Sequence, residues 1–298
     1  MQTIRVDAQE PRVNRSFLFV PADSERKLTK ARDSAADALI IDLEDSVASS
    51  ERPKARQIAR EFMSDAAQQE LWLRINPLDT ADALLDLREV MPAAPSGIVL
   101  PKPEGARDAL QLAKLLDVLE QENGSEPGST AIMPIATETP GALFRLREYG
   151  EGTERLAALT WGAEDLSAAL GAAVTRDDAG NWLPLYELAR SLCLIAAAAA
   201  KVPAVDTVFT NFRDGEALAR YAGNARRDGF AGMLAIHPAQ VDIINEAFRP
   251  TAAEVDRAQR IVDLFAADPE AGTLGMDGEM VDRPHLLKAR KVLQRAGG

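Results

Sequence analysis

Residues 38–45, ALIIDLED, form the stretch that decides the fold. Its first four residues are continuously apolar instead of alternating with polar ones, which is typical of a parallel strand covered by helices. Similar short apolar runs recur along the chain, separated by longer stretches of helical period, and this is the pattern of repeated βα units. We expect eight strands, at residues 17–20, 38–43, 71–75, 97–101, 131–136, 156–161, 205–210 and 232–236.

The segments between the strands predict amphipathic helices at residues 24–34, 54–65, 79–90, 106–119, 139–148 and 185–201. Pro203 follows the last of these and would end it. An open doubly wound sheet has the same alternation, but eight strands in a chain of this length favour closure. We therefore predict the α/β class and a single (β/α)8 TIM barrel over residues 1–248.

Residues 249–298 do not follow the βα repeat. Thr251-Ala252-Ala253-Glu254 has the form of a capping box and predicts a helix that runs to about Ala267. Three glycines between residues 272 and 278 predict a loosely structured stretch, and a last helix is expected to begin near Arg283-Pro284. We expect a C-terminal helical extension, not an independent domain, that packs as a lid on its own barrel or on a neighbouring subunit.

The composition excludes several classes of function. A formal net charge of −12 argues against nucleic acid as the main partner, because that function needs a concentrated basic face. Cys193, the single cysteine, lies in an apolar run and is expected to be a buried structural thiol in a reducing compartment. The N-terminus lacks the apolar stretch of a signal peptide, and the uncharged run at 191–200 falls short of the roughly 20 residues of a membrane span. We expect a soluble, cytoplasmic protein with no membrane partner.

Polar residues gather where the predicted strands end. In an α/β barrel the catalytic groups lie at the carboxyl ends of the strands and in the loops that follow. The chain leaves six predicted strands with such groups: Asp42-Leu43-Glu44-Asp45, Arg74-Ile75-Asn76-Pro77, Pro101-Lys102-Pro103-Glu104, Thr137-Glu138-Thr139-Pro140, Trp161-Gly162-Ala163-Glu164-Asp165 and Ile236-His237-Pro238.

Glu138 and Asp165 are the candidate metal ligands. They are 27 residues apart, about one βα unit, so they should end neighbouring strands, which lie about 4.8 Å apart. Two carboxylates that close raise each other's pKa unless a cation intervenes. Oxygen ligands that leave room for water and substrate suit Mg²⁺. The alternative is that one carboxylate caps a helix and the other pairs with an arginine.

Arg74 is the candidate anion clamp, since a guanidinium grips a carboxylate in a planar, two-pronged way. The alternative, which the spacing supports equally, is that Arg74 is a structural partner of Glu44 or Asp45. Arg15 and Lys27, with Lys30, flank the first strand and helix. These cations either neutralise phosphates or are ordinary solvated charges.

Other chemistries find little support in the sequence. The histidines, His237 and His285, have no ligand spacing, so a zinc site is not expected. Walker A, Gly-x-Gly-x-x-Gly and Gly-x-Ser-x-Gly motifs are absent. A Schiff-base role for Lys102 is disfavoured, because its Pro-Lys-Pro setting offers no mechanism for lowering its pKa.

These residues together resemble the citrate lyase beta chain and malyl-CoA lyase superfamily. The resemblance rests on motifs that occur in the family's order from residue 15 to about residue 290, and Ala22 departs from it, because relatives usually carry glycine there. The matching motifs are Arg15-Ser16-Phe17-Leu18-Phe19-Val20-Pro21, the segment 38–47, Arg74-Ile75-Asn76-Pro77, Thr137-Glu138-Thr139, Gly162-Ala163-Glu164-Asp165-Leu166 and Ile236-His237-Pro238.

The resemblance implies a (β/α)8 barrel, commonly a homotrimer, with Mg²⁺ held by Glu138 and Asp165. It implies that Arg74 contacts the substrate acid or thioester oxygen, and that basic residues near the first strand approach a coenzyme A phosphate. The segment 277–285 is similar to the tail of relatives that use coenzyme A thioesters, in which an aspartate matching Asp282 reaches an adjacent subunit's site as the acid/base. On sequence alone, Asp282 also suits the N-cap of the last helix.

The chemistry expected from this resemblance is the interconversion of a 3-hydroxyacyl-CoA, such as malyl-CoA or citramalyl-CoA, with acetyl-CoA and a 2-oxo acid. Arg74 and Asp282 are the expected catalytic residues, and Arg74, Glu138, Arg15, Lys27, Glu44 and Asp45 the expected substrate contacts. The alternatives are the citryl-carrier-protein lyase subunit of citrate lyase, a malate synthase-like thioesterase, and a non-catalytic acyl-CoA-binding barrel. The identity of the 2-oxo acid is left open.

Overall fold

The computed structural model describes residues 14–65 and 67–297. The chain divides into two compact units, one comprising Asn14–Ala247 and the other containing Phe248–Gly298.

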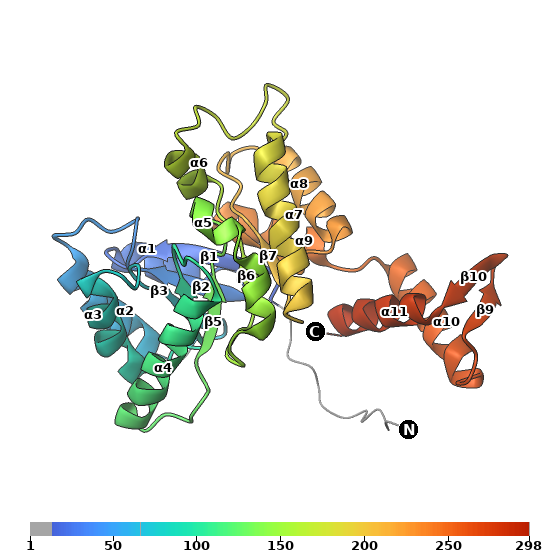
Figure 1. Ribbon diagram of the computed structural model, residues 1–298, viewed down its shortest axis with the longest axis horizontal. Helices are drawn as coiled ribbons and strands as arrows, with labels where there is room; N and C mark the ends of the chain where they lie inside the picture. Colours follow the sequence, from blue (N-terminus) through green and yellow to red (C-terminus); the bar gives the residue numbers. More distant parts are fainter. Residues whose placement is uncertain (1–13, 66, 298) are drawn as a thin grey trace. The chain divides into compact units, whose positions relative to one another are not determined.

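The larger unit is a barrel of eight parallel strands surrounded by helices (Figure 1). Parallel pairing runs in the order β5-β4-β3-β2-β1-β8-β7-β6. The remaining seam, between β5 and β6, is joined by the parallel bridges Ile132–Leu156 and Ile135–Thr160. The predicted barrel is therefore confirmed, and the open doubly wound sheet is excluded. The strands are β1 (Ser16–Pro21), β2 (Ala38–Asp42), β3 (Glu70–Arg74), β4 (Gly97–Leu100), β5 (Ala131–Pro134), β6 (Leu159–Thr160), β7 (Ala204–Asp206) and β8 (Gly232–Ala235).

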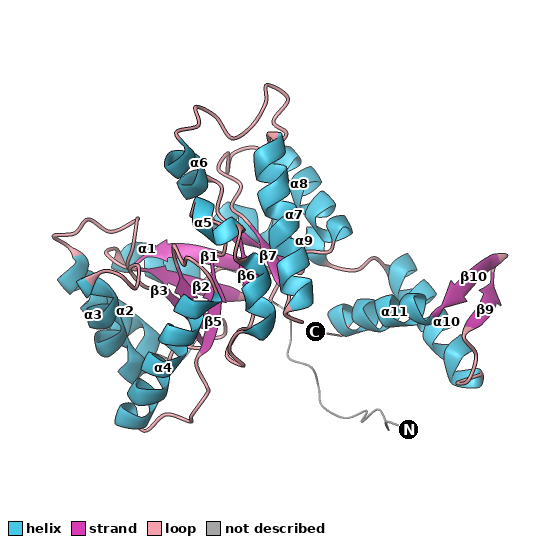
Figure 2. Cartoon of the chain, viewed as in Figure 1, coloured by secondary structure: helices cyan, strands magenta, loops and turns pink. Residues whose placement is uncertain are grey.

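Helices follow each strand and cover the outside of the barrel (Figure 2). The helix predicted at residues 139–148 is only partly correct, because α5 covers a single turn and a 3-10 helix, η2 (Leu146–Glu151), follows it. The helices of this unit are α1 (Glu25–Arg32), α2 (Arg52–Ser64), α3 (Ala81–Val90), α4 (Ala106–Asn123), α5 (Pro140–Leu143), α6 (Glu164–Leu170), α7 (Pro184–Ala199), α8 (Gly215–Asp228) and α9 (Val241–Phe248), with the 3-10 helices η1 (Met91–Ala93) and η3 (Pro238–Gln240).

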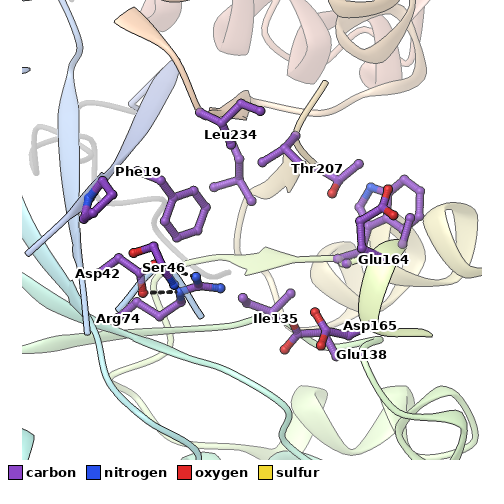
Figure 3. Close-up of a pocket in the computed structure, with 16 residues that line it drawn as sticks. Phe19, Asp42, Ser46, Arg74, Ile135, Glu138, Glu164, Asp165, Thr207 and Leu234 are labelled. Carbon is purple, nitrogen blue, oxygen red and sulfur yellow. Dashed lines mark hydrogen bonds and ion pairs between the residues drawn. The ribbon is translucent and has the colours of Figure 1, made fainter. Parts of the chain in front are cut away.

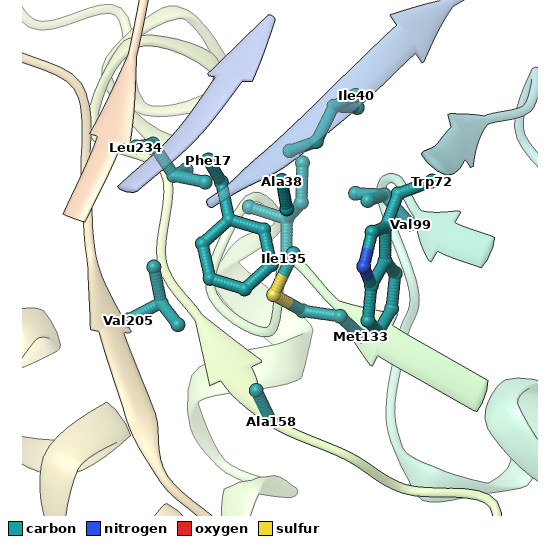
Figure 4. Close-up of a cluster of buried hydrophobic side chains, with 10 residues drawn as sticks. All are labelled: Phe17, Ala38, Ile40, Trp72, Val99, Met133, Ile135, Ala158, Val205 and Leu234. Atoms are coloured by element: carbon teal, nitrogen blue, oxygen red, sulfur yellow. The ribbon is translucent and has the colours of Figure 1, made fainter. Parts of the chain in front are cut away.

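Alternate strand residues fill the barrel interior (Figure 4). Phe17 and Trp72 meet edge to face with ring centroids 5.9 Å apart. A side chain at position 97 would overlap the Trp72 ring, so Gly97 makes room for that ring. The intervening residues, such as Leu39 and Ile41, are fully buried beneath the helices. This double burial explains why the strand at 38–41 is apolar throughout.

The amino end of the barrel is held by ion pairs in which each carboxylate contacts an arginine. Arg15 donates from Nε and Nη2 to Asp37, with both distances 2.8 Å. Arg155, just before β6, donates from Nη2 to Glu120 (2.6 Å) and to Asp117 (2.5 Å), and from Nη1 to the carbonyl of Thr130 (3.0 Å). These contacts tie α4 and β5 to the seam that closes the barrel.

The tail unit contains helices α10 (Ala252–Ala267) and α11 (Arg283–Ala296). Thr251 and Glu254 form the predicted capping box. The stretch expected to be loosely structured is instead an antiparallel hairpin of β9 (Thr273–Met276) and β10 (Glu279–Asp282), so that expectation is wrong. Asp277 and Gly278 form its two-residue turn with φ of 54° and 82°, the conformation that Asp-Gly favours in hairpins.

The hairpin is ordered because its apolar residues have a core to join. Met276 and Val281 are buried against side chains of both tail helices, including Ile261, Phe265 and Leu286. The sequence prediction weighed the three glycines and overlooked the alternating apolar residues. In the described part of the chain, no helix is long and apolar enough to cross a membrane.

Candidate active site

A cavity of about 290 Å³ opens at the carboxyl ends of the strands (Figure 3). Phe19, Ile135 and Leu234 form an apolar part of its wall, and Arg74, Glu138 and Asp165 contribute charged groups. Five of these six side chains belong to strands or to the first residues after them, and Asp165 lies in the first turn of α6. The cavity therefore has the position that active sites take in this fold.

Arg74 ends β3 and is held in a fixed orientation. Its Nε and Nη2 donate to the two carboxylate oxygens of Asp42, at 2.6 and 2.7 Å, and its Nη1 lies 3.0 Å from Glu44. Its guanidinium also lies over the ring of Phe19, 4.8 Å from the centroid. Burial would raise the pKa of Asp42, but the charge and hydrogen bonds of Arg74 outweigh it and lower that pKa. Asp42 takes two of the five N–H donors of the guanidinium, so others are left to bind an anion.

Lys102 connects four strand ends. Its Nζ lies 2.5 Å from Glu44, 3.2 Å from Asp45 and 3.2 Å from Asp165. Its backbone has a φ of 49°, in the left-handed region, and its N–H donates to Glu138 Oε2 at 2.5 Å. Burial would lower the pKa of Lys102, but Glu44 and the other carboxylates raise it above its usual value. Lys102 is therefore held as an ammonium by its carboxylate neighbours.

Glu138 is the buried carboxylate of the cavity. Burial and the nearby charge of Asp165 raise the pKa of Glu138 well above its usual value, and the Lys102 N–H and Arg74 offset this only in part. A side chain at position 162 would come within 2.9 Å of Glu138 Cγ, so Gly162 leaves room for this carboxylate. Figure 3 shows the carboxylates of Glu138 and Asp165 together at one side of the cavity.

Carboxylates outnumber cations at this end of the barrel. We call this group of five carboxylates and two cations the acidic rim, and it carries an excess of three negative charges when all are ionised. A divalent cation between Glu138 and Asp165 would offset most of this excess, and it would stabilise the ionised form of Glu138. The residues present therefore fit Mg²⁺ with protein ligands on one side only. The acidic rim comprises Asp42, Glu44, Asp45, Glu138, Asp165, Arg74 and Lys102.

Two expected substrate contacts have other partners in the structure. The carboxylate of Glu44 is buried between Arg74 and Lys102, and Asp45 is half exposed beside Lys102. Both residues therefore hold the cations of the rim in place. Neither residue lines the cavity.

Arg15 lies at the wrong end of the barrel for the expected role. It precedes β1 and pairs with Asp37 before β2, whereas the cavity lies where the strands end. The structure therefore does not bring Arg15 to the cavity. The sequence alone could have predicted this position, because a residue that precedes a barrel strand lies at the amino end of the barrel.

Lys27 lies in a second hollow beside the carboxyl end of β1. This hollow has a volume of about 530 Å³ and is lined by Arg26, Lys27 and Lys30 of α1 and by His237 after β8. Phe19, Pro21 and Ile236 line both hollows. The basic residues that flank the first helix thus gather next to the cavity.

Asp282 belongs to the tail unit, where it is the N-cap of α11. Its Oδ1 accepts from the backbone N–H of His285 at 3.3 Å, and the imidazole Nδ1 lies 2.5 Å from the same oxygen. The hydrogen bond with His285 lowers the pKa of Asp282. The N-cap interpretation is thus observed, and it is compatible with a role in proton transfer. Cys193 is fully buried, as predicted.

The sequence interpretation missed the main partner of Arg74. It named Glu44 and Asp45, whereas Asp42 makes the two-pronged contact. Strand register would have identified Asp42, because Asp42 and Arg74 face each other across β2 and β3. A second omission is Asp206 at the end of β7, which accepts from Trp161 Nε1 at 2.7 Å and from Arg190 Nη2 at 2.8 Å and fixes that wall of the cavity.

The chain belongs to the HpcH/HpaI aldolase/citrate lyase family, whose model matches residues 15–238. It is 33% identical over 300 residues to the citrate lyase subunit beta of Escherichia coli (strain K12), covering 99% of this chain and 97% of that protein. It is likewise 33% identical over 286 residues to the (3S)-malyl-CoA thioesterase of Cereibacter sphaeroides (strain KD131), covering 95% of this chain and 94% of that protein. The resemblance inferred from the motifs is therefore confirmed.

A solved structure of protein CitE from Mycobacterium tuberculosis, in complex with magnesium, acetoacetate and coenzyme A, is similar with a TM-score of 0.78. The two sequences are 32% identical, and the match covers 96% of this chain and 99% of that one. The two chains thus share the barrel fold over nearly their whole length.

Proposed function

We propose that the chain is a Mg²⁺-dependent carbon–carbon lyase that cleaves or forms a 3-hydroxyacyl-CoA, such as malyl-CoA or citramalyl-CoA. The products of cleavage are acetyl-CoA and a 2-oxo acid. The observation that carries this proposal is the placement of Glu138 and Asp165 in one cavity with the guanidinium of Arg74.

Glu138 and Asp165 would hold the metal. Bound Mg²⁺ supplies Lewis acidity and a template for the hydroxy or keto oxygen and its neighbouring carboxylate. The buried position of Glu138 and the raised pKa of its carboxyl support this assignment, since a carboxylate in that environment needs a cation when ionised.

Arg74 would stabilise negative charge on the substrate. In cleavage, the bond between the hydroxyl-bearing carbon and the thioester α-carbon breaks, the hydroxyl proton passes to solvent water, and the electron pair passes to the thioester as an enolate. Asp42 and Glu44 orient Arg74 before substrate arrives, so its free donors are already aimed when charge develops.

The basic hollow at α1 would bind the coenzyme. Arg26, Lys27 and Lys30 place three cations beside the cavity, where a coenzyme A phosphate could pair with them while the thioester reaches Arg74. The coenzyme A in the CitE complex supports this ligand class.

Asp282 would be the acid/base, contributed by a neighbouring copy within a homotrimer. It would protonate the enolate in cleavage and take a methyl proton in condensation. The family resemblance of the tail supports this role, as does the partly exposed carboxylate, with 32% of the Asp282 side chain accessible.

Two other activities remain as alternatives. A relative is named a (3S)-malyl-CoA thioesterase, so hydrolysis of the thioester after or instead of cleavage is one. A relative named citrate lyase subunit beta makes cleavage of a carrier-bound citryl group the other.

The test is turnover of malyl-CoA and citramalyl-CoA by the full chain, with and without Mg²⁺, followed by separate assays for 2-oxo acid, acetyl-CoA and free coenzyme A. Release of 2-oxo acid together with acetyl-CoA, only with Mg²⁺, is expected. Free coenzyme A without 2-oxo acid identifies a thioesterase, and turnover restricted to a carrier-bound citryl group identifies the citrate lyase activity. No turnover of any substrate by folded, Mg²⁺-binding protein overturns the proposal.

A further inference from the structure

Three capping boxes in the described chain differ in the residue that closes them. The closing side chain is Gln240 in η3, Glu254 in α10 and His285 in α11. Of these three side chains, an imidazole is the one that ordinarily changes charge near neutral pH. It also contacts Asp282, the carboxylate to which the proposed function gives the acid/base role.

The side chains of His285 and Asp282 lie close enough to share a proton. Nδ1 of His285 is 2.5 Å from Oδ1 of Asp282, and an unprotonated nitrogen and an ionised oxygen repel at that distance. The backbone N–H of His285 donates to Oδ1 at 3.3 Å. The backbone N–H of Asp282 lies 3.2 Å from Nδ1, but it can donate there only when Nδ1 carries no hydrogen, so this contact and an Nδ1–H donating to Oδ1 exclude each other. The contact between Nδ1 and Oδ1 is the shorter of the two. Oδ1 is therefore committed to His285, whereas among the described residues Oδ2 has no hydrogen-bond partner.

We propose that His285 is the positioning residue of Asp282: it holds Oδ1 through a shared proton and leaves Oδ2 as the atom that exchanges a proton with the substrate. This inference rests on the proposed function, because it assumes that Asp282 moves a proton. No covalent step is added, since the proton that Oδ2 takes from the thioester methyl group in condensation is the one it returns in cleavage.

The other charged groups of the tail unit have partners of their own or lie along the helix. Glu279 and Asp277 of the hairpin pair with Arg257 and Arg260 of α10, at 2.7 and 2.6 Å. Arg283 of α11 donates to the carbonyl of Pro269. The remaining charged residues of these elements and of the turn between them are Glu254, Asp256, Asp263, Asp268, Glu270, Lys288, Arg290, Lys291 and Arg295.

The experiment compares condensation of acetyl-CoA with a 2-oxo acid in wild type, H285A, H285Q and D282N across pH 5–9, at saturating Mg²⁺. A base must be ionised to act, and His285 lowers the pKa of Asp282. Without the imidazole, the acid limb of kcat therefore moves to higher pH, and kcat on that limb falls about tenfold for each pH unit of displacement. H285Q keeps a capping-box side chain with an amide donor, so its displacement is expected to be smaller.

A second measurement reads the proton directly. With two histidines in the chain, ¹⁵N spectra of the imidazoles are assigned by comparison with H285Q. We expect the neutral ring of His285 to carry its hydrogen on Nδ1 in wild type and on Nε2 in D282N. E254Q is the matched control, because it alters the closing residue of the α10 capping box and is expected to leave the acid limb in place.

The outcomes separate the two proposals. An unshifted acid limb in H285A, with D282N inactive, overturns the role of His285 and leaves the proposed function standing. A wild-type ring protonated on Nε2 has the same consequence. Full activity in D282N removes the acid/base assignment of Asp282 and this inference together, whereas a displaced limb with the Nδ1 hydrogen supports both.

Discussion

The two ends of the barrel both gather ionised side chains, but they balance them differently. At the amino end, Arg15 is matched with Asp37, and Arg155 is enclosed by Glu120, Asp117 and a carbonyl oxygen. At the carboxyl end, the acidic rim has five carboxylates and two cations, and Glu138 has no side-chain cation within hydrogen-bond distance among the described residues. Each of the three carboxylates at the amino end contacts an arginine, whereas Glu138 at the carboxyl end contacts a backbone N–H and leaves a negative charge that a bound cation would offset.

This contrast is visible in the direction of the pKa shifts. Burial would raise the pKa of Glu120, but Arg155 and the N–H groups of Thr130 and Gly128 outweigh it and lower the pKa to about 2. Burial raises the pKa of Glu138 as well, and there Asp165 adds to the effect. The same residue type is thus stabilised as an anion at one end and destabilised as an anion at the other.

The largest expected effect is that of E138Q at the acidic rim. We expect turnover to fall by about 10³-fold or more, because the metal loses a ligand. Without Mg²⁺ the variant should unfold at the same temperature as wild type or at a higher one. The folded state raises the pKa of Glu138, so at a pH above the usual pKa of a glutamate the ionised side chain destabilises the folded protein. Steady-state kinetics and thermal unfolding measure the two effects.

A useful control for E138Q is E120Q, which removes a buried carboxylate at the opposite end. It should lose stability and keep its turnover per folded molecule. The contrast between the two ends fails if E138Q lowers the unfolding temperature as much as E120Q does.

The next effect in size is that of R155L at the amino end. It leaves Glu120 buried without its cation, and breaking such a pair costs about 3–5 kcal/mol of the free energy of unfolding. The turnover of the folded enzyme should not change. R145A is the matched control, because the Arg145–Glu104 pair is exposed and its loss should cost less than about 1 kcal/mol. Urea unfolding measures both; equal losses in the two variants would contradict the assignment.

The smallest effect concerns acid stability. Glu120 stays ionised in the folded barrel down to about pH 2, whereas in the unfolded chain it binds its proton near pH 4.5. Its contribution is complete above pH 4.5 and is lost as pH falls toward 2, by up to about 2 kcal/mol because solvent screens part of the attraction. The free energy of unfolding should therefore decrease more steeply over this range in wild type than in E120Q. Parallel curves for the two proteins would rule out this source of acid sensitivity.

Local pattern predicted much of this protein. The apolar runs at all eight strands, the capping box at Thr251 and the placement of Glu138 and Asp165 one βα unit apart are features of short segments. These features can be predicted from the sequence because a buried parallel strand needs apolar residues on both faces, and because the last residues of all barrel strands lie at the same end.

The tertiary structure decided which charges meet. Lys102 and Glu44 are 58 residues apart, and their contact depends on the left-handed turn at Lys102. Arg74 selects Asp42 over its neighbours because strand register places those two residues side by side. The tail hairpin likewise forms because Met276 and Val281 find buried partners on two helices. Ion pairs and small cores depend on distances of a few ångströms between distant segments, and such distances exist only once the chain has folded.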